Sequence, residues 1–137
     1  MDYHFTRTMS LSLDEAIARV TDELKKEGFG VLTEIDVRET LKKKLNVDFR
    51  KYKILGACNP QFAYQALQAE DKIGTMLPCN VVVQETAGGT IEVSAVDPVA
   101  SMAAIENPAL AKTVEQVRTK LKRVIEACSK SSTDSLN

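Results

Sequence analysis

The sequence predicts an α+β fold, in which a curved, largely antiparallel sheet carries a long C-terminal helix on one face. Three observations lead to this prediction. Strand-like segments alternate with helical ones in the first half of the chain. Two further strands then follow without a helix between them, joined by the turn signal Ala87-Gly88-Gly89. The chain closes with one long amphipathic helix that begins at Asn107-Pro108.

Alternation of apolar and polar residues, or short apolar runs, marks the expected strands. They lie at 3–9, 29–35, 52–58, 79–85 and 90–96. Helices are expected where a side chain able to cap the first turn precedes a helical pattern. These caps are Ser12, Asp36, Asn59, Asp97 and Asn107. Proline follows each of the last three, and its fixed φ and missing N–H suit the first helical position.

The last helix has the clearest periodicity in the chain. Its apolar residues recur at alternating spacings of three and four along one face. They are Leu110, Val114, Val117, Leu121, Val124 and Cys128. The opposite face is charged, so we expect the apolar stripe to be buried against the sheet.

Length and composition predict an ordinary globular protein. A chain of 137 residues is expected to form one domain, spanning 1–130, and is long enough to bury a core without disulfide staples. The final segment, 131–137, is small and polar, and we expect it to be a flexible tail.

Composition also argues against several classes of protein. The 18 basic and 19 acidic residues nearly cancel, whereas binding to nucleic acid calls for a basic surface. No apolar run approaches the roughly 20 residues of a membrane span, and the charged start "MDYHFTRTMS" is not typical of a signal peptide. Three cysteines, an odd number, argue against a disulfide framework and favour the cytoplasm.

Two Cys-Asn pairs, Cys58-Asn59 and Cys79-Asn80, are the most informative segments for chemistry. Cys58 is expected where a strand leads into the first turn of a helix. The unpaired N–H groups and the helix dipole at such a point stabilise a thiolate and lower the pKa of a cysteine. Cys79 opens a strand, and an antiparallel neighbour would bring it beside the end of the Cys58 strand. We therefore expect one pocket shared by both thiols, near the helix that starts at Pro60.

Structural interpretations of the same residues stay open. Free cysteines are often buried and act as small hydrophobic residues, which fits Cys128 and is an alternative for Cys58 and Cys79. Asn59 is first of all a helix cap. Asp36 completes the set of candidate ligand-binding residues, although its position also predicts a cap.

The sequence assigns no catalytic residue and no cofactor. It contains no Cys-x-x-Cys motif, no glycine-rich phosphate loop and no histidine-rich metal motif. His4 is the only histidine and is expected at the surface, so histidine-dependent catalysis would need it to reach the site. If a metal binds, the candidate ligands are Cys58 and Cys79, whose thiolates could hold a soft ion such as Cu(I).

The run from Gly28 to Leu67, followed by "LPCNVVV" and "VSAVDP", resembles a known family. Its specific features are Gly28-Phe29, Asp36, Cys58-Asn59-Pro60, Pro78-Cys79 and Asp97-Pro98. In this combination the chain is similar to the small bacterial and archaeal proteins grouped as domain of unknown function 302. The resemblance implies a helix-grip-like fold, related in shape to the TATA-binding-protein fold class, and a homodimer. It implies no reaction.

Four functions are compatible with these residues. The first is a ligand-binding module, in which Cys58, Asn59, Cys79, Asn80 and Asp36 surround a pocket. The second is thiol chemistry, either sulfur transfer or a redox role, by Cys58 with Cys79 as its partner. The third is binding of a soft metal by the same thiols, and the fourth is a structural or partner-binding dimer with inert thiols. The absence of an acid–base pair favours the first.

Overall fold

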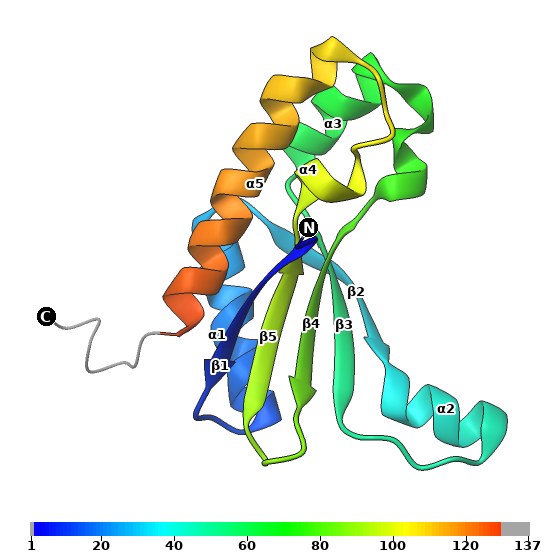
Figure 1. The fold of residues 1–137 in the computed structure, drawn as a ribbon, viewed down its shortest axis with the longest axis vertical. Helices are drawn as coiled ribbons and strands as arrows, with labels where there is room; N and C mark the ends of the chain where they lie inside the picture. The colour runs from blue at the N-terminus through cyan, green and yellow to red at the C-terminus, as the bar shows by residue number, and fades with distance from the viewer. Residues whose placement is uncertain (1, 130–137) are drawn as a thin grey trace, which may run out of the picture.

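The computed structural model describes residues 2–129 (Figure 1). In chain order, its elements are β1 (His4–Met9), α1 (Leu13–Lys26), β2 (Gly30–Asp36), α2 (Val37–Leu45), β3 (Tyr52–Cys58), α3 (Pro60–Ala69), the 3-10 helix η1 (Asp71–Met76), β4 (Cys79–Glu85), β5 (Ile91–Val96), α4 (Pro98–Ser101) and α5 (Pro108–Cys128). The segment 131–137, expected as a flexible tail, lies outside the described residues.

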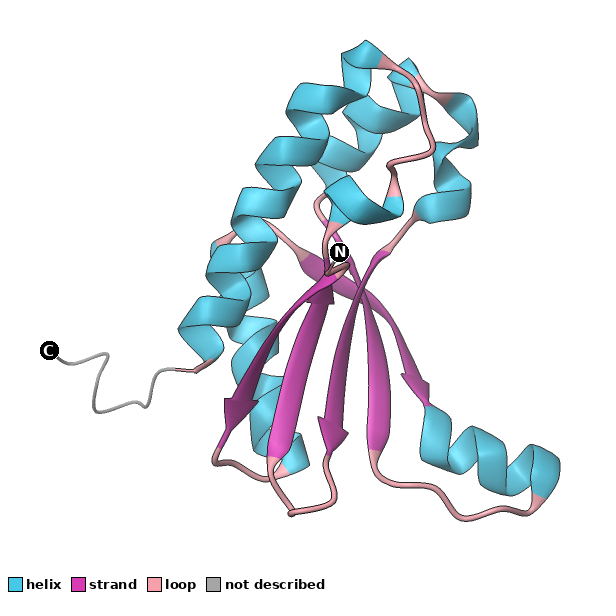
Figure 2. Ribbon diagram, viewed as in Figure 1, coloured by secondary structure: helices cyan, strands magenta, loops and turns pink. Residues whose placement is uncertain are grey.

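The strands form one five-stranded sheet in the order β1-β5-β4-β3-β2. Every neighbouring pair is antiparallel, and the sheet does not close on itself. Figure 2 shows the strands as one twisted layer with the long helices beside it. The predicted α+β fold, with an antiparallel sheet and a long C-terminal helix, is therefore confirmed.

One face of the sheet is buried and the other is open. On β4 and β5, alternate residues are buried because successive side chains of a strand point to opposite faces; these are Cys79, Val81, Val83, Ile91, Val93 and Ala95. Helices α1 and α5 cover this face, and Leu24 and Leu121 are fully buried in the same cluster. On the open face, the hydroxyl groups of Thr6 and Ser94 bond across strands at 2.8 Å.

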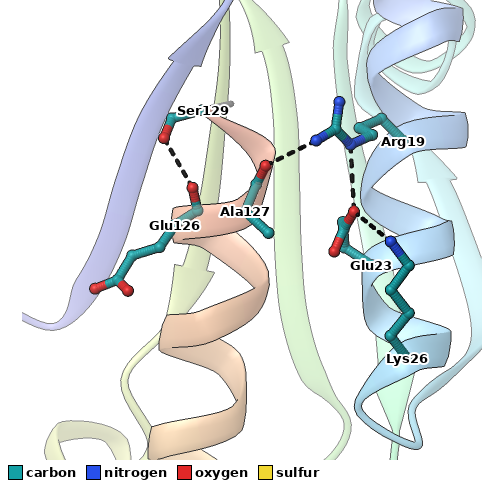
Figure 3. Close-up of polar contacts among 6 residues, drawn as sticks. All are labelled: Arg19, Glu23, Lys26, Glu126, Ala127 and Ser129. Carbon is teal, nitrogen blue, oxygen red and sulfur yellow. Dashed lines mark hydrogen bonds and ion pairs between the residues drawn. The ribbon is translucent and has the colours of Figure 1, made fainter. Parts of the chain in front are cut away.

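Arg19 fastens the end of α5 to α1 (Figure 3). Its Nη2 donates to the Ala127 carbonyl at 2.9 Å, and its Nε donates to Glu23 Oε1 at 3.3 Å. Lys26 Nζ also donates to Glu23, at 3.0 Å. Glu23 is only 8% exposed, and a buried carboxylate is tolerated when charged partners satisfy it. The guanidinium also lies at the C-terminus of α5, where the helix dipole favours positive charge.

The N-terminal half of α5 packs differently from the sequence prediction. Leu110 is buried, but it packs with Ala66 of α3 and Ile73 of η1 instead of the sheet. A helix of 21 residues is about 31 Å long, whereas strands of six or seven residues span about 20–24 Å. The first turns of α5 therefore extend past the sheet, and α3 and η1 cover them.

We predict that Leu121→Ala lowers the free energy of unfolding by about 2–5 kcal/mol, because the fully buried side chain leaves a cavity in the main core. Urea unfolding followed by circular dichroism measures this change. Lys122→Ala, on the exposed side of the same helix, serves as the control and should stay within about 0.5 kcal/mol of the wild type. Equal effects of the two substitutions would contradict the packing described for α5.

Candidate functional site

The candidate site is a cavity at the end of the sheet where β3 ends and β4 begins. Its walls come from these two strand ends, from α3 and α4, and from the N-terminal half of α5. The cavity volume open to the centres of water-sized spheres is about 40 Å³. It lies at the seam between the two hydrophobic clusters, because Ala57 and Val117 belong to the sheet cluster while Ala66 and Val114 belong to the cluster around Leu110.

Strand register brings the two thiols together. Ala57 on β3 is directly opposite Cys79 on β4, so Cys58 lies one residue beyond the partner of Cys79. Both cysteines line the cavity, and both are free thiols. Cys58 is half-buried, whereas Cys79 is only 8% exposed.

The environment of Cys79 favours the neutral thiol. The pKa of Cys79 is raised from 9.0 to about 11. Burial is the main cause, and the nearby Cys58 adds a smaller contribution. A neutral thiol is a poor nucleophile, since the thiolate is the reactive form. Cys58, which is only half-buried, is the more accessible thiol of the pair. At neutral pH, Cys79 is a protonated group in the wall of the cavity.

The side chain of Asn59 has structural partners at both ends. Its Oδ1 accepts a hydrogen bond from Phe62 N at 3.4 Å, which caps α3 as predicted. Its Nδ2 donates to the Glu27 carbonyl at 3.3 Å. Gly28 follows with a φ of +86°, and a Cβ atom there would lie 2.9 Å from Asn59 Nδ2, so both the turn and the close approach require glycine. Asn59 lines the cavity, but its amide is already used to fix α3 against the α1–β2 connection.

Phe62 lies between the cavity and the surface. Its ring lines the cavity and also a surface groove that includes Lys120 and Arg123. Lys120 Nζ lies 6.0 Å from the ring centroid, and Arg123 Nη2 is paired with Glu27 Oε1 at 2.8 Å. Phe62 is therefore a wall shared by the cavity and that groove.

Asn80 and Asp36 are not at the cavity. Asn80 is exposed on the open face of the sheet, beside His4 and Tyr52, because it follows Cys79 in the strand and so points to the other side. Asp36 pairs with Lys53, at the opposite end of β2 from the strand end near Cys58. Its Oδ1 accepts from the backbone N–H of Glu39 at 2.9 Å, so it serves as the cap of α2.

The apolar walls of the cavity were not apparent from the sequence. Phe62, Met102 and Val114 come from three different elements, and no local pattern signals that they meet. Asp97 was expected as a cap and does accept from Val99 N at 3.0 Å. Asp97 Oδ2 also forms an ion pair with Arg118 Nε at 3.2 Å, which joins the start of α4 to α5. This pairing could not be predicted, because the two residues are far apart in the sequence.

Two further findings concern residues 2–129. No three histidine, cysteine, aspartate or glutamate side chains in this part of the chain are arranged to hold a metal ion. None of its helices is long and apolar enough to cross a membrane.

Comparison with known proteins identifies the family. The sequence profile described as "Domain of unknown function DUF302" matches residues 5–128, so the chain belongs to this family, as the resemblance predicted. A crystal structure of an uncharacterized conserved DUF302 protein from Bacillus stearothermophilus is similar, with a TM-score of 0.86 and 32% identity. The similarity covers 93% of this chain and 99% of that chain. No curated protein matches the chain.

We predict that alkaline pH destabilises the fold partly through Cys79. The Cys79 thiol has a pKa of about 11 in the folded protein and of 9.0 in the unfolded chain. The stabilisation of the fold that results from this difference is complete below pH 9 and is lost as the pH rises towards 11. The unfolding free energy of the wild type should fall by about 1.4 kcal/mol per pH unit more than that of Cys79→Ala. Urea unfolding of both proteins from pH 8 to 11 measures the difference, and parallel pH profiles would contradict it.

Proposed function

We propose that this protein binds a small, weakly polar ligand in the cavity beside Cys58 and Cys79. One observation carries the proposal: two thiols from neighbouring strands line a single cavity whose other walls are almost entirely apolar. Soft, polarisable sulfur atoms and hydrocarbon walls favour ligands of the same character.

The size and polarity of the cavity restrict the ligand. A single water molecule needs about 10–15 Å³ by the same kind of measure, so a cavity of about 40 Å³ has room for only a few heavy atoms. A strongly polar molecule would lose its hydrogen bonds to water there, because the walls offer few partners. Nucleotides and other large cofactors do not fit without rearrangement. A short alkyl thiol or thioether fits both limits.

The test is a thermal-unfolding series with ethanethiol, dimethyl sulfide and xenon under reducing conditions. A ligand that binds only the folded protein raises the melting temperature, and above its dissociation constant the stabilisation grows with the logarithm of the ligand concentration. We expect stabilisation of the wild type and none of Ala63→Leu, which fills the cavity from α3. Ala18→Leu, on the exposed side of α1, is the matched control and should respond like the wild type. Equal responses of all three proteins would place binding elsewhere, and no response at all would remove the proposal.

Thiol redox chemistry is the second candidate. It is favoured by the proximity of Cys58 to Cys79, seen both in the strand register and in the influence of Cys58 on the pKa of Cys79. A peroxide would oxidise the Cys58 thiol to a sulfenic acid and be reduced to water or an alcohol. The Cys79 thiol would then condense with the sulfenic acid, forming a disulfide and releasing one water. This step would be slow at neutral pH, because burial raises the pKa of Cys79 and so favours its neutral form. Soft-metal binding ranks lower, because burial opposes the second thiolate that Cu(I) would require.

Exposure to one equivalent of hydrogen peroxide tests the redox candidate. We expect a Cys58–Cys79 disulfide by non-reducing peptide mapping, with Cys58→Ser preventing it and Cys128→Ser leaving it unchanged. Sulfinic acid at Cys58 without any disulfide would exclude Cys79 as a partner. Ligand-induced stabilisation persisting in Cys58→Ser would separate binding from redox chemistry.

We further propose a single-domain subunit that forms a homodimer in the cytoplasm. The three free cysteines fit a reducing compartment. Support for the dimer comes from exposed apolar side chains in and directly after the edge strand β2: Leu32 and Ile35 lie in β2, and Leu45 and Val47 lie at the end of α2.

A further inference from the structure

Helix α2 has little support from its own subunit. Of the α-helices in residues 2–129, it is the one with no buried residue. It has nine residues, and isolated helices shorter than about 12–15 residues are marginal in water. Figure 1 shows α2 projecting from the lower end of the sheet, away from α1 and α5. Leu45 and Val47, at its end, are 66% and 43% exposed. A partner surface would stabilise a helix of this kind.

The same segment is strongly basic. We define the basic arm as residues 37–51, which comprise α2 and its connection to β3. The arm has six basic and two acidic side chains, although the whole chain has a net charge of −1. Lys43 and Lys42 each have one acidic neighbour within the arm, Glu39 and Asp48, and both pairs are solvent-exposed. The arm therefore presents excess positive charge together with exposed apolar side chains.

A complementary surface lies at the other end of the molecule. We define the acidic cap as residues 60–76, which comprise α3 and η1, together with residue 106. Glu70, Asp71 and Glu106 lie in it, and Asn107 holds the segments together by donating to the Ala69 carbonyl at 2.8 Å. The cap therefore has three acidic side chains and one basic side chain, Lys72, whose Nζ is paired with Asp71 Oδ2 at 2.9 Å. The cap also exposes three large apolar side chains: Tyr64 (65%), Leu67 (44%) and Met76 (40%).

The positions of arm and cap suit a two-fold dimer. In Figure 1, α2 and the green turns of η1 lie on the same side of the molecule, at opposite ends of the sheet. The edge strand β2 runs between them, and among residues 2–129 no strand pairs with its outer side. A two-fold axis beside β2 inverts the second copy, so each arm comes to lie beside the cap of the other copy. Both contacts form at once, as a closed two-fold interface requires.

We infer that a second copy of this chain is the partner of the basic arm, which docks on the acidic cap of that copy. The inference rests on the homodimer proposed above and assigns its interface. Each contact pairs positive with negative charge and covers apolar side chains on both surfaces. The cap includes α3, whose inner side lines the thiol cavity through Phe62 and Ala63, so the partner's arm packs directly outside the candidate site.

Charge reversal tests the interface. The arm variant is Lys43→Glu/Lys44→Glu, and the cap variant is Asp71→Lys/Glu106→Lys. The arm variant leaves the arm with four basic and four acidic side chains and so removes its net attraction to the cap, whereas the cap variant makes the cap basic and repels the arm. We expect the dimer dissociation constant of each variant alone to rise at least tenfold. A mixture of the two variants keeps one unsubstituted arm–cap contact and pairs the substituted side chains with opposite charge at the other, so we expect a mixed dimer close to wild-type affinity. Sedimentation velocity at several concentrations, in 50 mM and 500 mM salt, measures these constants, and the wild-type dimer should weaken at the higher salt.

Controls make every outcome decisive. Lys25→Glu/Lys122→Glu changes the charge by the same amount on exposed parts of α1 and α5, and should leave the dimer intact. Far-UV circular dichroism verifies that each variant is folded. A stable dimer of the cap variant would overturn the arm–cap interface while leaving the homodimer in place. A wild-type protein that is monomeric at 100 μM would overturn both.

Discussion

The mismatch in length between α5 and the strands determines most of this structure. The C-terminal half of α5 packs with α1 on the one covered face of the sheet, and the N-terminal half extends beyond it. A second hydrophobic cluster, formed with α3 and η1, is needed to bury Leu110. The cavity lies where the two clusters meet, because neither set of side chains fills the seam completely. The candidate site is thus a packing consequence of a helix that is too long for its sheet.

The two thiols of the seam differ in their access to water. Cys79 is enclosed by the strand ends and keeps its proton, while Cys58 is half-buried at the start of α3. Asn59 and Gly28 fix this corner, since the amide bonds both the first turn of α3 and the end of α1. A binding site and a redox pair are both consistent with such an arrangement, and both depend on the same rigid corner.

Local signals in the sequence predicted the elements well, and long-range placement was harder. The caps at Ser12, Asp36 and Asn59 act within one helical turn, so the residues that define them are neighbours in the chain. Asn80, in contrast, was expected at the pocket with Cys79 but lies on the opposite face, because successive side chains of a strand alternate. Asp36 likewise lies at the far end of β2 from the cavity, and Leu110 packs on η1, a helix with no clear pattern of its own. Which apolar residues meet around the thiols depends on strand register and on helix ends from distant segments.

The strand order also has a consequence for how the chain folds during synthesis. β1 is hydrogen-bonded only to β5 within the described sheet, where Met9 is paired with Ile91 and His4 with Val96. Neither pair can form before β5 has been synthesised. Strands β2, β3 and β4, in contrast, each pair with the next strand along the chain. Contacts between distant segments slow folding, because a long loop must close before any of them forms. On the ribosome, the meander from β2 to β5 can assemble as it emerges, while the first strand stays unpaired until the last strand is complete.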